Sequence, residues 1–218
     1  MHRTNMAQTQ IPWHWHEEVE FGYLEQGNLE VRTVNQTYHF HSGEGFFINP
    51  NVLASMQSDS KNPNSIYCAH LFHPIFLSGH FKSIFETKYV APVIQDKRFD
   101  LVELHGTTAL QKTILSLLQK ASALQEQPDQ EFQIRNLFSE IWLLLISEIE
   151  LLKTKTLPIK PMEQERIQTM LSYIQQNYMH PISLEEIALS CGFSNSAYFS
   201  KIFREHKGMT PGTYRKSL

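Results

Sequence analysis

The sequence contains few cysteines, little net charge and no long apolar segment. Its 218 residues include two cysteines, Cys68 and Cys191, which lie far apart and have no partners at metal-binding spacing. This usage excludes a disulfide framework and fits a reducing compartment, so we expect a cytoplasmic protein. The longest purely apolar run covers residues 141–146, far short of the roughly 20 residues of a membrane span. The N-terminus also lacks a signal pattern, and we expect no membrane partner.

The net charge of −3 is unevenly distributed along the chain. Residues 1–159 carry 12 Lys and Arg against 17 Asp and Glu, whereas residues 161–218 carry 6 against 5. Within residues 195–218, five basic side chains stand against Glu205 alone, which gives a local charge of +4. A protein that is basic throughout is excluded, but the C-terminus can present a basic face to phosphate groups.

The N-terminal part has the pattern of an all-β domain. Between residues 13 and 72, short segments rich in Val, Tyr, Phe and Thr are separated by turn sequences at 26–28, 35–36, 42–45 and 49–51. Such spacing is typical of a small barrel or sandwich. Residues 29–34 alternate with period two, as expected of a strand with one buried face, and residues 35–36 suit a hairpin turn. We predict a β-barrel over residues 1–105.

Two amphipathic helices are expected next. After Gly106, apolar residues recur at three-and-four spacing from Leu110 to Leu124 and from Phe132 to Ile149, which indicates a helical hairpin within residues 106–153. Its apolar stripe can either cover the barrel or serve as a dimer surface, and both roles stay open here. A homodimer is the expected assembly. Residues 154–162, which contain two prolines, are the predicted linker.

Residues 163–218 read as a compact helical domain. A helix is expected over about 163–178, and Pro181 ends it. The signals for helix starts and ends that follow are a capping box at Ser183 and Glu186, a left-handed turn at Gly192, a cap at Ser194 and a Thr210 cap before Pro211. A short helix, a glycine turn and a longer helix form the pattern of a helix-turn-helix motif. The fold class is therefore α+β with several domains.

The longer helix has two different faces. At 100° per residue, one face carries Phe199, Ile202 and Phe203, whereas the opposite face carries Ala197, Ser200, Lys201 and Arg204. This pattern and the local charge favour DNA binding over the alternative of a merely solvated face. The residues assigned to the core of the domain are Ile187, Ala188, Phe193, Phe199 and Phe203.

Several motifs carry a family resemblance. The segments PISLEEIALSCGFS at 181–194, YFSKIFR at 198–204, GMTP at 208–211 and YR at 214–215 resemble the DNA-binding domain of AraC-type (AraC/XylS) bacterial transcription regulators. HWHEEVE at 14–20 and GEGFFINP at 43–50 resemble the cupin sensor domain of a subgroup of that family. The resemblance implies an effector-responsive, sequence-specific regulator of promoter DNA, without a cofactor, whose effector is a small organic molecule and often a sugar.

The resemblance also assigns roles to residues of the helix-turn-helix. A recognition helix presents its N-terminal residues to base edges, and a lysine can reach guanine O6 and N7, so Lys201 is the expected guanine contact. The predicted base contacts are Asn195, Ser196, Ala197, Ser200 and Lys201. The predicted phosphate contacts are Ser194, Tyr198, Arg204, Lys207 and Arg215. For each of these residues the alternative is plain solvent exposure.

One departure from the family pattern weakens this assignment. Members of the family carry two helix-turn-helix motifs, but the residues after Met162 leave room for one. Weak operator binding is therefore expected. The alternative function on this ground is a truncated homologue that does not bind DNA and acts by heterodimerisation.

The histidines near the N-terminus raise the question of a metal. His14, His16 and Glu20 share parity along an extended segment and have the spacing of the first cupin metal motif. The second motif would add a histidine, but Ala54 stands at that position. We therefore expect no metal and no enzyme, and we assign the residues to the polar lining of an effector pocket, with a metal-dependent cupin enzyme as the alternative function. The predicted pocket residues are His14, His16, Glu18, Glu20, Tyr38 and Phe47.

Overall fold

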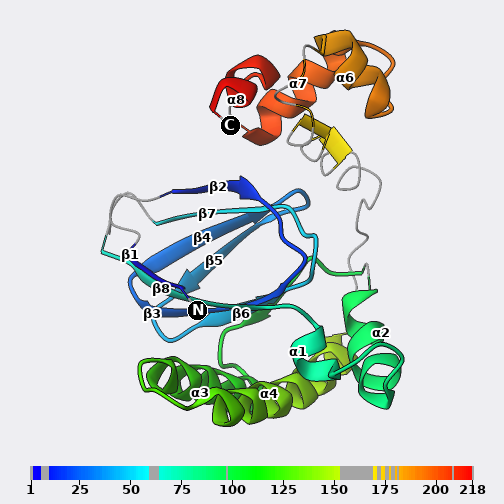
Figure 1. Ribbon diagram of the computed structural model, residues 1–218. Helices are drawn as coiled ribbons and strands as arrows, with labels where there is room; N and C mark the ends of the chain where they lie inside the picture. Colours follow the sequence, from blue (N-terminus) through cyan, green and yellow to red (C-terminus); the bar gives the residue numbers. More distant parts are fainter. Residues whose placement is uncertain are drawn as a thin grey trace.

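The computed structural model describes residues 2–5, 10–58, 64–96, 98–152, 169–170, 173–174, 177, 180, 182–207 and 209–217. Two antiparallel sheets face each other in its N-terminal part (Figure 1). One sheet has the strand order β1 (His2–Asn5), β8 (Ile66–Phe72), β3 (Val19–Gln26), β6 (Gly45–Ile48) and β9 (Leu101–Leu104). The other has the order β2 (Ile11–His14), β7 (Ala54–Ser58), β4 (Asn28–Thr33) and β5 (Thr37–His41).

The strand predicted over 29–34 is confirmed as β4, and it pairs with β5 from Asn28 opposite His41 to Arg32 opposite Thr37. The predicted hairpin turn at 35–36 is also confirmed, because the Thr33 amide donates to the carbonyl of Gln36 at 2.9 Å. Strands β1 and β9 lie outside the segment in which strands were expected. Three short helical segments in the predicted barrel range were not foreseen: α1 (Ile75–Ser78), a π-helical turn η1 (Glu86–Val90) and α2 (Ala91–Ile94).

The two predicted amphipathic helices are α3 (Ala109–Gln125) and α4 (Glu131–Leu152). They lie along the outer face of the five-stranded sheet (Figure 1). Their apolar residues, among them Ile114, Phe138 and Trp142, join one core cluster with Phe21 and Phe47 of the sheet. The stripe therefore covers the sheet, which is one of its two expected roles; the homodimer stays a prediction.

Strand β3 is buried on both faces, which explains its unbroken run of buried residues. Val19 and Phe21 face α3 and α4, whereas Leu24 belongs to a second cluster of 13 buried residues between the two sheets. Because side chains alternate along a strand, Glu20 and Gly22 also face the space between the sheets. A β-carbon at Gly22 would overlap the ring of Phe46, so glycine is required for the ring to fill the barrel.

The C-terminal helices are α6 (Leu184–Ser190), α7 (Ser196–Lys207) and α8 (Pro211–Ser217). The capping box is confirmed: the Glu186 amide donates to Ser183 Oγ at 3.1 Å, and the Ser183 amide donates to Glu186 Oε2 at 2.7 Å. Gly192 has the predicted left-handed conformation, with φ of 75°. The cap of α7 is Asn195 instead of the predicted Ser194, since Asn195 Oδ1 accepts from the Tyr198 amide at 2.7 Å.

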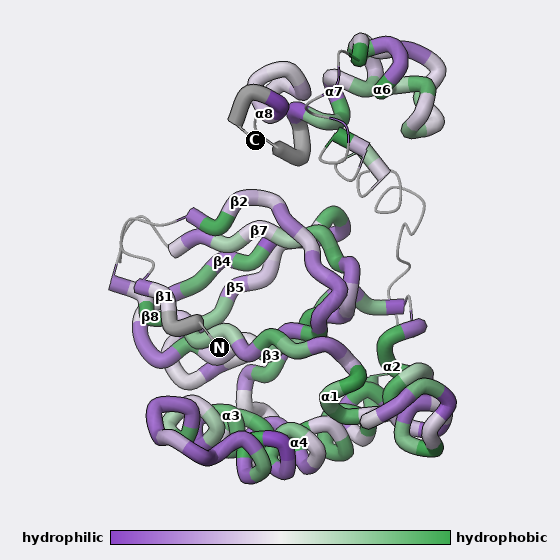
Figure 2. Tube along the Cα trace, in the orientation of Figure 1, coloured by the Kyte–Doolittle hydropathy of each residue, from purple (hydrophilic) through white to green (hydrophobic). Residues whose placement is uncertain are grey.

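The predicted core of the helical unit is also confirmed. Ile187, Ala188, Phe193, Phe199 and Phe203 are buried in a third cluster. Helices α6 and α7 lie next to each other in the trace (Figure 2). The predicted linker over 154–162 lies outside the described residues, as does most of the helix expected over 163–178. Among the described residues no helix is long and apolar enough to cross a bilayer.

Candidate DNA interface and effector site

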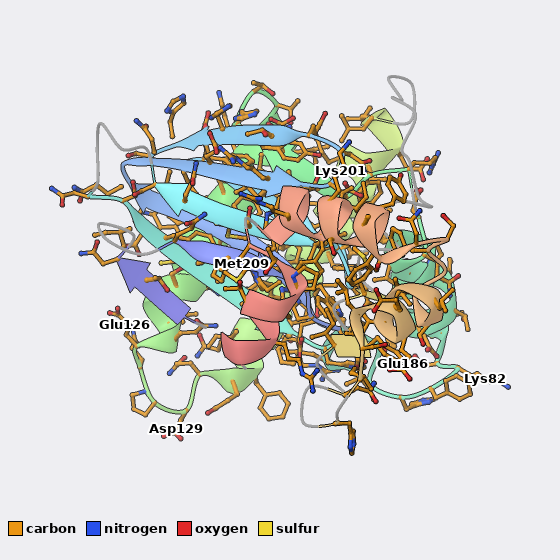
Figure 3. The ribbon with its side chains drawn as sticks, turned by 90° about the horizontal axis from the view of Figure 1, so that it is seen from above. Lys82, Glu126, Asp129, Glu186, Lys201 and Met209 are labelled. Atoms are coloured by element: carbon orange, nitrogen blue, oxygen red, sulfur yellow. The ribbon has the colours of Figure 1, made fainter. Side chains whose placement is uncertain are left out.

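Helix α7 presents the face that the sequence assigned to DNA. Phe199 and Phe203 are buried, whereas Ala197, Lys201 and Arg204 are exposed and Ser200 is half-buried. Figure 3 looks down on this unit and marks Lys201 on α7. A surface hollow of about 560 Å³ lies beside the face and is lined by Ser200, Lys201, Arg204 and Thr210. The two basic side chains therefore flank a shallow hollow in the surface.

The residues at the start of α7 are partly engaged within the domain. Asn195 caps the helix, and Ser196 Oγ donates to Glu185 Oε1 at 3.0 Å. Ser194 is exposed. Tyr198 is 47% exposed and its ring lies 5.8 Å from that of Phe193. The contacts of Ser196 and Tyr198 hold the start of α7 against α6 and the turn that follows it.

Arg215 has a structural position that the charge count did not reveal. Its guanidinium donates to the carbonyls of His180 and Ile182, at 3.1 Å for the latter. These bonds tie α8 to the chain that enters α6, and they engage both terminal nitrogens of the guanidinium. The side chain of Lys207, another predicted phosphate contact, lies outside the described residues.

Three of the six predicted pocket residues converge at the end of β2 and the start of β3. The candidate ligand atoms of His14, His16 and Glu20 all lie within 4.8 Å of one another. His16 Nε2 is 3.2 Å from Glu20 Oε2, and the two imidazole centroids are 5.8 Å apart. The chain leaves one sheet at His14 and enters the other at Val19, and this passage between the sheets brings the three side chains together.

Glu20 is a buried carboxylate with two polar neighbours. It is 3% exposed, and the hydroxyl of Tyr67 on β8 donates to its Oε1. Burial and the charge of Glu20 raise the pKa of Tyr67 well above its ordinary value, so the hydroxyl keeps its proton. Burial acts to lower the pKa of His16, but the hydrogen bond and charge of Glu20 outweigh it and raise that pKa. Glu20 therefore favours a positive charge beside it.

The other predicted pocket residues have different positions. Glu18 lies near the rim, with Oε2 3.8 Å from His16 Nδ1 and a half-exposed side chain. Tyr38 belongs to the cluster between the sheets. The structure does not bring Phe47 to the group: it packs on the outer face of its sheet, with its ring 5.6 Å from that of Trp142. Ala54 pairs directly with His14, so a methyl group occupies the place where a further histidine would stand.

The β2 segment also contacts the helical unit. Trp13, Trp15 and Leu53 pack in the same cluster as Phe199 and Phe203 of α7, and β2 lies next to α7 in the ribbon (Figure 1). The sequence analysis missed this contact. The available signal was the pair of tryptophans that alternate with His14 and His16, because alternation sends the two residue types to opposite sides of an extended segment.

Comparison with known proteins assigns both parts of the chain. A family model described as the AraC-like ligand binding domain matches residues 2–143, well over half of the sequence. The model of bacterial regulatory helix-turn-helix proteins of the AraC family matches residues 174–216. The chain belongs to the AraC family. It is a transcription regulator that combines a ligand-binding domain with a helix-turn-helix DNA-binding domain.

Relatives of this AraC-family chain include regulators from other bacteria. The uncharacterized HTH-type transcriptional regulator YdeC of Bacillus subtilis is 25% identical over 201 residues, which cover 89% of this chain and 67% of YdeC. The HTH-type transcriptional regulator GadX of Escherichia coli K12 is 30% identical over 91 residues, 38% of this chain and 33% of GadX. The crystal structure of ToxT from Vibrio cholerae O395 has 14% identity and a TM-score of 0.47, with 96% of this chain and 94% of that chain covered.

Proposed function

We propose that α7 is the recognition helix of this regulator and that an effector bound beside β2 controls its access to promoter DNA. The observation that carries the proposal is the two-sided character of α7. Phe199 and Phe203 are fully buried, and Lys201 and Arg204 project from the opposite face. An exposed helix held on a rigid apolar base and edged with cations has the geometry that major-groove reading requires.

The expected roles of the basic residues differ. We assign Lys201, with Ala197 and Ser200, to base edges and Arg204 to phosphate, because phosphate contacts position a protein while base contacts specify the sequence. Tyr198 remains a phosphate candidate, because its side chain is partly exposed and its hydroxyl can donate to a phosphate oxygen. Arg215 acts as a positioning residue, since its bonds to the carbonyls of His180 and Ile182 hold the helices together.

Fluorescence anisotropy tests these assignments with the full chain, using DNA from upstream of its own gene and a scrambled duplex, over a salt series. Lys201→Ala should weaken binding to the specific duplex by about 1–3 kcal/mol and reduce discrimination between the duplexes. Arg204→Ala should weaken both complexes alike and reduce the salt slope by about one.

Lys120→Ala is the matched control, because Lys120 is an exposed lysine on α3, on the far side of the barrel from α7 (Figure 1). Its affinity and discrimination should equal those of the unmodified chain. Equal weak binding to both duplexes by the unmodified chain would contradict the proposal and favour a homologue that acts by heterodimerisation. Specific binding that Lys201→Ala leaves unchanged would contradict the assignment of Lys201.

The effector is expected at the His14, His16 and Glu20 group, next to the contact between β2 and α7. A ligand can act on DNA binding only if it has different affinities for two arrangements of the protein. A site on one side of β2 and the helical unit on the other side provide such a connection. The homodimer and a sugar effector, both expected from the family resemblance, remain predictions.

A further inference from the structure

We propose that His14, His16 and Glu20 bind a divalent transition-metal ion, and that this ion is the effector that sets the position of the helix-turn-helix unit. The proposal rests on the proposed function and names the chemical class of its effector. Two imidazoles and one carboxylate form a ligand set that suits Zn²⁺, Fe²⁺ or Co²⁺ and leaves coordination positions open.

The orientation of the two histidines supports a metal. His14 Nδ1 lies 2.9 Å from the carbonyl of Pro12, and His16 Nδ1 lies 2.9 Å from the carbonyl of Glu18. A carbonyl accepts only, so each Nδ1 carries a proton and each Nε2 can offer its lone pair. Metal-binding histidines are oriented in the same way, by a hydrogen bond from the nitrogen that does not bind the ion.

Glu20 and His16 already have the separation that one ion requires. Two ligand atoms about 2.0–2.1 Å from an ion and about 90–109° apart lie roughly 2.9–3.4 Å from each other, and the observed separation of His16 Nε2 from Glu20 Oε2 is 3.2 Å. The Tyr67 hydroxyl bonds to Oε1, which leaves Oε2 directed at the imidazole. Without an ion, a proton on His16 Nε2 bridges the two atoms as a hydrogen bond. An ion would take the place of that proton between the same two ligand atoms.

The packing around the ligand group is compatible with a ligand as small as an ion. Thirteen buried side chains fill the interior between the sheets, and the Phe46 ring lies directly against Gly22, two residues from Glu20. An ion needs only the gap among its ligands. Ala54, opposite His14, adds no ligand, so solvent would complete the coordination.

The position of His14 connects the ion to the DNA-binding unit. The full ligand group spans up to 4.8 Å, wider than the pair formed by His16 and Glu20, so the ion would draw His14 inward. Trp13 and Trp15 flank His14 in the chain and pack in the cluster of Phe199 and Phe203. A displacement of this segment therefore changes the apolar surface on which α7 packs.

The first experiment measures binding of Co²⁺, by its visible absorption, and of Zn²⁺, by calorimetry, to the full chain after chelator treatment. One ion per chain is expected. His14→Ala and Glu20→Gln should weaken binding by roughly 100-fold or more, since even outer-shell changes cost 10- to 100-fold. His39→Ala is the matched control, because His39 is an exposed histidine of β5, and it should bind like the unmodified chain.

The second experiment repeats the DNA anisotropy titration with and without Zn²⁺ and records tryptophan emission. Zn²⁺ should change the affinity for the specific duplex by roughly 5- to 150-fold, and it should not do so in His14→Ala. Absence of metal binding, or binding that survives both site variants, would overturn the site. Metal binding with an unchanged DNA affinity would overturn its role as effector. Loss of all DNA binding would instead refute the proposed function, while the metal isotherm would still test the site.

Discussion

The buried histidine of β8 should make the stability of the sensor domain depend on pH. His70 is 1% exposed and packs against Phe138, with the ring centroids 5.2 Å apart. Ser122 Oγ donates to the carbonyl of Leu118 at 3.1 Å and accepts from His70 Nε2 at 3.0 Å. Nδ1 has no partner within the part of the chain that the structure describes. Burial lowers the pKa of His70 from 6.5 to about 4.

The sign of the effect follows from this depressed pKa. Between pH 6.5 and about 4, the unfolded chain takes up a proton at His70 but the folded chain does not. Acid therefore stabilises the unfolded state, and the free energy of unfolding falls through this window. At 1.36 kcal/mol for each pKa unit, the total loss is about 3 kcal/mol. The loss is absent above pH 6.5 and stops growing below pH 4, where the folded state also binds the proton.

Urea denaturation between pH 4 and pH 7.5 measures this contribution in the unmodified chain and in His70→Gln. The glutamine keeps a donor for Ser122 but does not titrate. The difference in unfolding free energy between the two proteins should shift by about 3 kcal/mol across the window, with the variant less sensitive to acid. Identical pH dependence in both proteins would refute the assignment of a buried, neutral His70.

Three further outcomes are expected. Gly22→Ala should lower the free energy of unfolding by about 1–3 kcal/mol in urea titrations, because the new methyl group overlaps the Phe46 ring. Gly212→Ala is the control: a β-carbon there meets nothing within 4 Å, so this variant should not be destabilised. Ser183→Ala should destabilise the helical unit by about 1 kcal/mol in thermal melting, through loss of the cap. Cys191, whose pKa burial raises to about 11, should resist iodoacetamide at pH 8 until the chain is unfolded; rapid alkylation of the folded protein would contradict its burial.

The features that the sequence predicted correctly are those set by neighbours in the chain. The capping box needs only Ser183 and Glu186, three residues apart, and both of its hydrogen bonds are present. The alternation of β4 reflects one buried face and one exposed face. The periodicity of α3 and α4 reflects one apolar side pressed on the sheet. In each case the local pattern was enough to predict the element, although it did not tell which surface α3 and α4 would cover.

The features that could not be predicted depend on which side of a sheet a residue occupies. Phe47 was assigned to the effector pocket, but β6 is buried on both faces, so its sequence shows no alternation from which the inward side could be chosen. Tyr67 was not assigned at all, and its contact with Glu20 depends on the register between β3 and β8. For Arg215, charge counting did not show that the guanidinium bonds to the backbone carbonyls of His180 and Ile182; its phosphate contact stays a prediction.

The contact between the two domains also depends on which side of a strand each residue occupies. Neither the charge of residues 195–218 nor the spacing of His14, His16 and Glu20 indicates that the two sites are neighbours. They become neighbours because Trp13 and Trp15 extend the apolar core of the helical unit onto the barrel. If that contact couples the sites, Trp15→Ala should uncouple them: the affinity for an effector ion should persist, because the ligands are unchanged, while its influence on DNA binding should disappear. Equal coupling in this variant, measured by the same anisotropy titration with and without Zn²⁺, would show that any signal between the domains travels by another route.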